Sequence, residues 1–233
     1  MVRNGTTLTL ERKAKGRARK APAMIRSLVI AGWTGRNAEA MEAHIRELEA
    51  LGIARPKSTP IFYRVAASLL TTAPEIEVAG DSSSGEVETV VFALDDGLWV
   101  GVGSDHTDRK VETVGVTISK QMCAKPVAGT VWRFDDVADH WDELVLRSYA
   151  IEGKKRRLYQ EGPVARMRPP RELTALYLGR GKRLPKGTAM FCGTLAVIGH
   201  IAPADAFEIE LEDPILRRKI RHRYAVKRLP VEG

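Results

Sequence analysis

The chain has 233 residues, of which 44% are hydrophobic and 28% charged, as expected of a folded soluble protein. Apolar residues occur along its whole length, which excludes a mainly disordered chain. The longest stretch without Lys, Arg, Asp or Glu, residues 187–204, contains glycines, a proline and a histidine, so no membrane span is expected. Cys123 and Cys192 lack CxxC spacing, which argues against a disulfide framework or a zinc site. No signal peptide is visible, and a cytoplasmic location is expected.

The formal net charge is +8, and six basic residues without an acid lie in residues 12–20. We interpret this segment as a solvated N-terminal loop. A second basic cluster, residues 217–223, lies within an expected strand. Nucleic acid is not expected as a partner because neither cluster contains the interleaved aromatic residues that stack on bases. A non-catalytic binding protein that uses the basic loop for an acidic partner remains an alternative.

The first elements follow from short-range patterns. Thr7–Leu10 and Ser27–Gly32 read as strands on either side of the basic loop. A helix is expected from about Asn37, a suitable N-cap, to about Leu51, because apolar residues recur there at helical spacing. An extended segment follows from residue 61.

The rest of the chain is rich in strands. Between Glu86 and about Ser119 the pattern indicates strand, turn, strand, loop and strand. A second helix is expected from Asp135 or Asp136, and a shorter one from Pro169-Pro170. The tail, residues 190–229, returns to strands. Helices that interrupt a strand-rich chain indicate an α+β fold with mixed sheets.

The sequence GEVETVVFAL places two carboxylates on the core side of a strand. Side chains alternate between faces, so Glu86 and Glu88 share a face with Val90 and Phe92. Two such carboxylates repel each other and resist desolvation, so they normally need a cation, either Arg or Lys or a metal ion. A solvated strand edge is the alternative explanation.

The segment GSDHTDRKVE follows the next strand, GLWVGVG, and carries Asp105, Asp108, Arg109 and Glu112. Loops at strand ends commonly carry binding and catalytic residues. These charged groups can equally pair with one another across a turn, so the pattern alone leaves both interpretations open.

Three further features have both a functional and an ordinary structural explanation. His44 and Glu47 lie at i, i+3 on the first helix, where a carboxylate can orient an imidazole as a general base or simply contact it. Thr194, in CGTLAVIG, offers a hydroxyl on a strand-to-turn segment. Lys120 reads as a lone lysine at the end of a strand, where it would be solvated.

The order of these motifs resembles the fumarylacetoacetate hydrolase family. The motifs are GRN followed by HIRE, then EVE, then SDHTDRKVE, the lysine of SKQMCAKP, and finally LPKG with CGT. The resemblance covers roughly residues 28–229. More closely, VIAGWTGR, VGSDHTDRKVE and AMFCGT resemble a divergent, uncharacterised prokaryotic branch with no assigned substrate.

The resemblance implies a fold and a site. The fold is a mixed β-roll core with peripheral helices: residues 1–60 form a small N-terminal segment with a lid-like helix, and 61–233 a metal-binding catalytic core. Mg²⁺ or Mn²⁺ is the implied cofactor. The implied residues are Glu86, Glu88 and Asp105 for the metal; His44, Glu47 and Lys120 for catalysis; and Arg109, Thr194 and Glu112 for substrate binding.

The implied activity is hydrolysis of a carbon–carbon bond in a β-diketo acid such as an acylpyruvate, a small 2-oxo acid. Decarboxylation or tautomerisation of a 2-oxo acid is the alternative on the same scaffold. A homodimer is also implied. The chain departs from the family pattern at Ser104, Asp108 and Glu112, and His106 lies inside the motif as a ligand, a base or neither.

Overall fold

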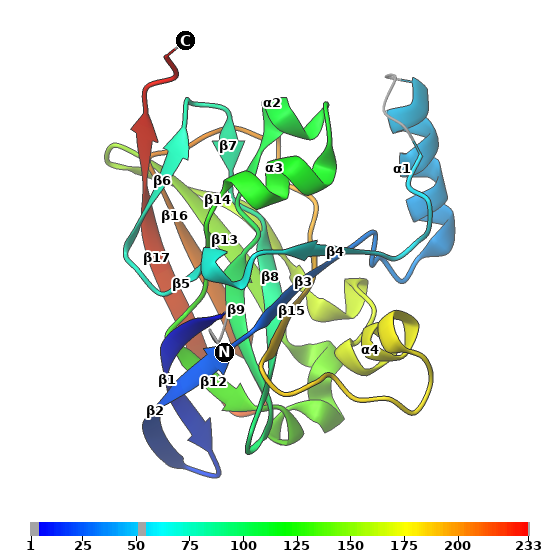
Figure 1. Cartoon of the computed structure of the whole chain (residues 1–233), viewed down its shortest axis with the longest axis vertical. Helices are drawn as coiled ribbons and strands as arrows, with labels where there is room; N and C mark the ends of the chain where they lie inside the picture. The colour runs from blue at the N-terminus through cyan, green and yellow to red at the C-terminus, as the bar shows by residue number, and fades with distance from the viewer. Residues whose placement is uncertain (1–4, 51–54, 233) are drawn as a thin grey trace.

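Two β-sheets form the body of the protein, seen in a computed structural model that describes residues 5–50 and 55–232, apart from the side chains of residues 40, 44, 47, 48 and 50 (Figure 1). The larger sheet has the order β2 (Arg17–Ile25), β1 (Thr6–Ala14), β12 (Thr130–Arg133), β9 (Gly97–Ser104), β8 (Val87–Leu94), β15 (Thr188–Thr194), β3 (Ser27–Gly32) and β4 (Ile61–Val65). The smaller has the order β14 (Lys155–Pro163), β13 (Val145–Glu152), β16 (Ala206–Asp213), β17 (Arg218–Leu229) and β6 (Glu75–Ala79). Both mix parallel and antiparallel pairs.

The main core lies between these two sheets. One apolar cluster joins Val91 and Val100 of the larger sheet to Ile209 and Ile220 of the smaller one. A second cluster consists of residues from the larger sheet, among them Phe92, and from the segments next to it. Both faces of the larger sheet are therefore buried, which is why β8 is apolar along almost its whole length.

Short elements surround the sheets. Two small strand pairs join β10 (Thr107–Asp108) to β7 (Ser83–Ser84) and β11 (Lys125–Pro126) to β5 (Leu70–Thr71). The helices are α1 (Ala38–Ala50), α2 (Arg109–Glu112), α3 (Val116–Met122) and α4 (Pro170–Leu178), with 3₁₀ turns at Ala67–Leu69, Phe134–Asp136, Ala138–Glu143 and Val164–Arg166. None of the helices in the described part of the chain is long and apolar enough to cross a membrane.

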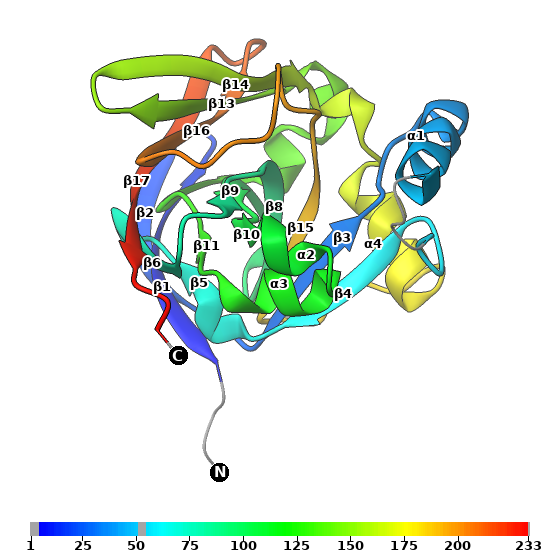
Figure 2. The ribbon, with the colours of Figure 1, turned by 90° about the horizontal axis from the view of Figure 1, so that it is seen from above.

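Helices α2 and α3 lie over one end of the larger sheet, where β8 begins and β9 ends (Figure 2). β8 and β9 are antiparallel, with Val87 opposite Ser104. β15 pairs with β8 on the other side, and Thr194 lies opposite Glu88. Residues far apart in sequence therefore meet at this end of the sheet.

The α+β fold and several expected elements are confirmed: α1, α4, β8, β9 and the strands of the C-terminal tail. The expected basic loop at residues 12–20 is wrong, because these residues lie in the β1–β2 hairpin. Lys15 and Gly16, with φ of 46° and 73°, form its two-residue turn. Positive φ at both central positions is typical of a type I′ turn, whose twist matches that of the flanking strands.

Two other expectations are wrong. The helix expected from Asp135 or Asp136 is a pair of 3₁₀ turns, since His140 has non-helical dihedrals and strand β13 begins at Val145. The third strand expected before Ser119 is replaced by α2 and α3, so Lys120 lies on a helix rather than at the end of a strand. The Asp108 side chain caps α2 by accepting a hydrogen bond from Val111 N. This local contact favours a helix more strongly than the β-branched residues of the segment favour a strand.

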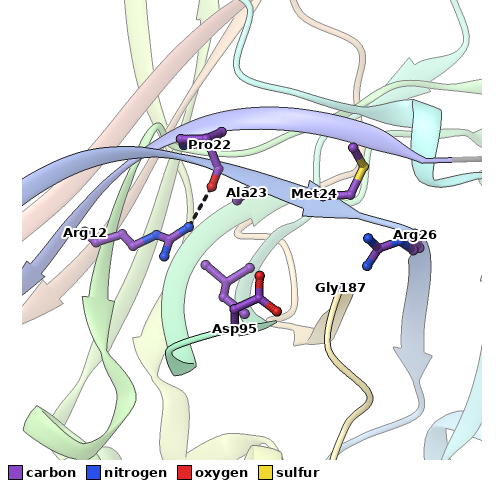
Figure 3. A pocket seen from close by; sticks show the side chains of 8 residues that line it. Arg12, Pro22, Ala23, Met24, Arg26, Asp95 and Gly187 are labelled. Atoms are coloured by element: carbon purple, nitrogen blue, oxygen red, sulfur yellow. Dashed lines mark hydrogen bonds between the residues drawn. The ribbon is translucent and has the colours of Figure 1, made fainter. Parts of the chain in front are cut away.

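A small cavity of about 40 Å³ lies beneath the hairpin and is lined partly by Arg12, Met24, Arg26 and Asp95 (Figure 3). Arg12 donates hydrogen bonds to the carbonyl of Pro22 and to Asp96, both at 2.8 Å. A space of this size holds only a few water molecules. It is therefore too small for an organic substrate.

Candidate metal centre

Three carboxylates meet where β8 begins and β9 ends. Glu86 directly precedes β8, Glu88 is its second residue, and Asp105 directly follows β9. One ligand oxygen from each lies within 4.8 Å of the others. Asp105 and Glu88 are buried, whereas the Glu86 side chain is 17% exposed, so we call the solvent-exposed edge of the triad at Glu86 the opening of the site. The antiparallel pairing of β8 with β9 thus brings together the three residues that the sequence groups as metal ligands.

Three cations surround this acidic triad of Glu86, Glu88 and Asp105, namely Lys120, Lys125 and Arg109. The Lys120 ammonium forms an ion pair with Asp105 Oδ2 and lies 3.6 Å from Glu86 Oε2. Lys125 Nζ lies 3.0 Å from the other oxygen, Asp105 Oδ1. Charge is therefore nearly balanced before any metal ion binds.

The two buried carboxylates differ in their electrostatic surroundings. Burial raises the pKa of Asp105, but the ammonium groups of Lys120 and Lys125 outweigh it and lower the pKa to about 2. Burial raises the pKa of Glu88 well above its usual value, and the charges of Asp105 and Glu86 raise it further. Glu88 is therefore the carboxylate that gains most from an additional cation.

The backbone of Gly193 supports Glu88. Its N–H donates a 2.6 Å hydrogen bond to Glu88 Oε2. Gly193 has φ of 99°, and a Cβ at this position would lie 1.7 Å from Thr34 Oγ1. Only glycine fits both the positive φ and this close approach. The glycine of CGT is thus required by the packing of its strand against Thr34.

The Thr194 hydroxyl lies next to Glu88 in the strand register, but it already has partners. It donates to the carbonyl of Val87 at 2.9 Å and accepts from Gln160 Nε2 at 2.8 Å. Gln160 is fully buried and also accepts a hydrogen bond from Val87 N at 3.0 Å. This network holds the start of β8 against the end of β15.

Arg109 is held by three side chains at the opening of the site. Its Nη2 lies 3.2 Å from Glu86 Oε1, its Nη1 donates to Glu112 at 2.9 Å, and its Nε donates to Ser84 at 2.7 Å. Burial lowers the pKa of Arg109, but the charges of Glu86 and Glu112 outweigh it and raise the pKa. The sequence leaves pairing and substrate binding open for these groups, and the structure shows pairing.

His106 faces away from the triad. Its Nδ1 lies 3.1 Å from the Tyr224 hydroxyl and its Nε2 lies 2.9 Å from Ser83 Oγ. Burial, together with the charges of Lys125 and Arg109, lowers its pKa to about 3, so the ring is neutral. Through these two contacts His106 anchors its loop, which also carries Asp105, to strands β7 and β17. Asp108, further along the chain, caps α2.

His44 and Glu47 both lie on α1, as the sequence predicts. Their side chains lie outside the described residues, so the predicted pairing of the two stays a prediction. In Figures 1 and 2, α1 stands to one side of the sheets, separated from α2 and α3.

Lys125 is the site residue that sequence analysis missed. It is fully buried, and its ammonium donates to the carbonyl of His106 at 2.5 Å in addition to facing Asp105. Lysine is almost never fully buried without a partner. The signal was its position in Cys123-Ala124-Lys125-Pro126-Val127, where a single charge interrupts an apolar run.

The donor set fits a hard divalent cation. Carboxylate oxygens are the ligands that Mg²⁺ and Mn²⁺ prefer, and such ions usually retain bound water as well. Asp105 Oδ1 is buried and lacks a hydrogen-bond partner, although Lys125 lies nearby. The residues present are therefore compatible with a Mg²⁺ or Mn²⁺ centre.

The architecture is that of the fumarylacetoacetate hydrolase fold. Yeast ynq8, a fumarylacetoacetate hydrolase family protein, matches with a TM-score of 0.65 and 15% identity, over 89% of this chain and 95% of its own. A 5-carboxymethyl-2-hydroxymuconate delta-isomerase from Mycobacterium smegmatis matches with 0.63 and 13%, over 92% and 84%. A 2-keto-3-deoxyarabinonate dehydratase matches with 0.62 and 18%, over 91% and 77%. These similarities confirm the predicted fold.

Within this fold class, the chain belongs to the family described as "Protein of unknown function (DUF2848)", whose model matches residues 31–224. No curated protein matches the chain. The match agrees with the resemblance to a branch without an assigned substrate.

Proposed function

We propose that this protein is a divalent-metal-dependent hydrolase that cleaves a carbon–carbon bond in a β-diketo acid such as an acylpyruvate. The observation that carries the proposal is the acidic triad, whose ligand oxygens lie within 4.8 Å of one another on a fumarylacetoacetate hydrolase fold. Glu86, Glu88 and Asp105 would hold Mg²⁺ or Mn²⁺. The ion supplies Lewis acidity and an anchoring point for the oxygens of a 2-oxo acid.

The positive groups around the triad suit an anionic substrate. In this proposal Lys120 stabilises negative charge that develops on the substrate as the bond breaks, and Lys125 neutralises Asp105 from the buried side. Arg109, with Glu112, lies at the opening, where it can orient the substrate. Thr194 can still accept a hydrogen bond at the other end of the site, although its proton is donated to Val87.

Hydrolysis also needs a group that takes a proton from water. We assign this role to His44, with Glu47 one turn along α1 as the residue that orients the imidazole. The helix would then contribute the base from outside the sheet, and its closure over the site would exclude bulk water. We also propose a homodimer, which analytical ultracentrifugation would test.

Decarboxylation or tautomerisation is a second candidate, because the similar structures include an isomerase and a dehydratase. Neither reaction needs an activated water molecule. The two candidates therefore make different demands on His44.

The test is turnover of an acylpyruvate and of oxaloacetate, with Mn²⁺ present, by wild type and by His44→Ala. We expect His44→Ala to lower acylpyruvate hydrolysis by about 10²–10⁴-fold, the usual contribution of a general base. Arg46→Ala, at an exposed position on the same helix, is the matched control and should retain activity. Unchanged hydrolysis in His44→Ala would exclude the assigned base, and activity on oxaloacetate alone would favour decarboxylation.

A further inference from the structure

The Lys120 ammonium lies among the same oxygens that a metal ion needs. Its side chain is 8% exposed and extends from α3 to Asp105 Oδ2, with which it forms an ion pair, and to Glu86 Oε2 at 3.6 Å. One ammonium group thus contacts two of the three carboxylates of the triad.

A divalent ion in this triad would lie close to that ammonium. Mg²⁺ and Mn²⁺ bind carboxylate oxygens at about 2.0–2.2 Å, so an ion shared by Asp105 and Glu86 would stand within a few ångströms of Lys120. Positive charges at that separation in a buried site repel strongly. Asp105 offers no easy alternative, because its second oxygen faces Lys125 at 3.0 Å.

We propose that Lys120 is an internal counter-ion that occupies the cation position of the acidic triad and is displaced when a divalent metal ion binds. This inference rests on the proposed metal centre. It assigns Lys120 a role before catalysis: the ammonium holds the carboxylates of Asp105 and Glu86 together, and it sets how tightly the metal binds by competing for their oxygens.

The structure offers the displaced ammonium a nearby position. Lys120 Nζ already lies 5.7 Å from the centroid of the Tyr63 ring on β4, within the range of a cation–π interaction. Because a lysine side chain has a flexible four-carbon stem, we infer that the displaced ammonium moves toward this ring. There it remains beside the opening of the site, available to an anionic group of the substrate.

Lys125 differs from Lys120 in this respect. It is fully buried and fixed between Asp105 Oδ1 and the carbonyl of His106. Its removal would leave the His106 carbonyl without this donor and Asp105 Oδ1 without its neighbouring cation, so it acts as a permanent neutralising charge. Of these two lysines, Lys120 contacts two ligand carboxylates and keeps a slight side-chain exposure of 8%, whereas Lys125 has none.

The test is the dissociation constant for Mn²⁺ alone, measured by isothermal titration calorimetry on wild type, Lys120→Met and Lys110→Met. Lys110 is exposed on α2 and serves as the matched control for loss of one nearby charge. We expect Lys120→Met to bind Mn²⁺ about tenfold or more tightly than wild type, since a close repulsive charge is removed, and Lys110→Met to change affinity by less than about threefold.

Equal or weaker Mn²⁺ binding by Lys120→Met, with wild type binding normally, would overturn the inference and leave the metal centre standing. If neither wild type nor Lys120→Met binds Mn²⁺, the proposed function fails and the inference fails with it. The two failures are therefore distinguishable.

A second measurement needs no substitution. Reductive methylation of wild type, mapped by mass spectrometry with and without saturating Mn²⁺, reports which lysines are free to react. We expect Mn²⁺ to increase the labelling of Lys120, while Lys125 stays protected and Lys110 is unchanged. Unchanged or lower labelling of Lys120 at saturating Mn²⁺ would contradict the displacement.

Discussion

At the residue scale, the distribution of charge within the triad decides which carboxylate depends most on a metal ion. Asp105 faces two lysines, and Glu86 faces Arg109 and Lys120. Among the described residues, Glu88 forms no ion pair, and its one hydrogen bond at the site comes from the backbone of Gly193. A buried, ionised carboxylate in this position destabilises the folded protein unless a further cation binds.

Gly193→Ala tests how the Glu88 carboxylate is held. The new Cβ would collide with Thr34 Oγ1 and would force alanine into φ near 99°. We expect a loss of roughly 1–3 kcal/mol in the free energy of unfolding, measured by urea titration, together with weaker Mn²⁺ binding as the N–H moves away from Glu88.

Gly199→Ala is the matched control, because Gly199 has a similar φ of 90° and nothing within 4 Å of an added Cβ. Gly199→Ala should show the loss of stability that comes from alanine at a positive φ, without the loss that comes from a steric collision. In the double variant Thr34→Ala with Gly193→Ala, part of the lost stability should return. Equal destabilisation by Gly193→Ala and Gly199→Ala would mean that the contact with Thr34 does not matter.

At the scale of elements, the smaller sheet carries a charge network around one buried acid. Glu210 on β16 is 2% exposed and pairs with Arg147 of β13 at 3.0 Å and with Lys219 of β17 at 3.2 Å. Arg221 of β17 contacts its other oxygen. The carboxylate thus links three neighbouring strands by ionic contacts.

We expect Glu210→Gln to lower the free energy of unfolding by about 1–3 kcal/mol at pH 7, because three cations lose the negative charge that they share. Burial raises the pKa of Glu210, but Arg221, Lys219 and Arg147 outweigh it and lower the pKa. Its contribution is therefore complete above the ordinary glutamate value and is lost as the pH falls through the lowered pKa of the folded state.

The difference between Glu210→Gln and wild type should accordingly shrink when urea unfolding is repeated at pH 3. Glu77→Gln, which removes an exposed acid paired with Lys227 at 2.8 Å, should change stability by less than about 0.5 kcal/mol at either pH. A difference for Glu210→Gln that grows on acidification would contradict the assigned direction of the pKa.

Elements were predictable from sequence where a periodic pattern and a local signal agreed. The apolar stripe of α1, the proline start of α4 and the alternation of Glu88 with Val90 and Phe92 belong to this group. Where the two disagreed, prediction failed: the β-branched residues before Ser119 suggested a strand, but the Asp108 cap and the Gly115 start produced two short helices.

At the scale of the whole molecule, the triad could be predicted because motif order carries it, whereas its surroundings depend on tertiary contacts. Lys125 reaches Asp105 through the pairing of β11 with β5, and Gln160 reaches Val87 from the other sheet. No local pattern specifies these contacts. The sequence therefore predicts which acids meet and, through the family resemblance, that Lys120 and Arg109 lie near them, but it does not predict the contacts of Lys125 and Gln160.

The central claim is that the triad is a metal centre that couples to the stability of the folded protein. Thermal unfolding of wild type and Glu88→Ala, first with EDTA and then with Mn²⁺ or Mg²⁺, tests it most directly, with Glu75→Ala at an exposed position on β6 as the control. An ion that binds only the folded state adds about 2.7 kcal/mol when it is about a hundredfold above its dissociation constant. We predict that wild type and Glu75→Ala gain this stability and that Glu88→Ala does not. A wild type that unfolds at the same temperature with EDTA and with either ion, or a Glu88→Ala variant that gains as much as wild type, would contradict the account.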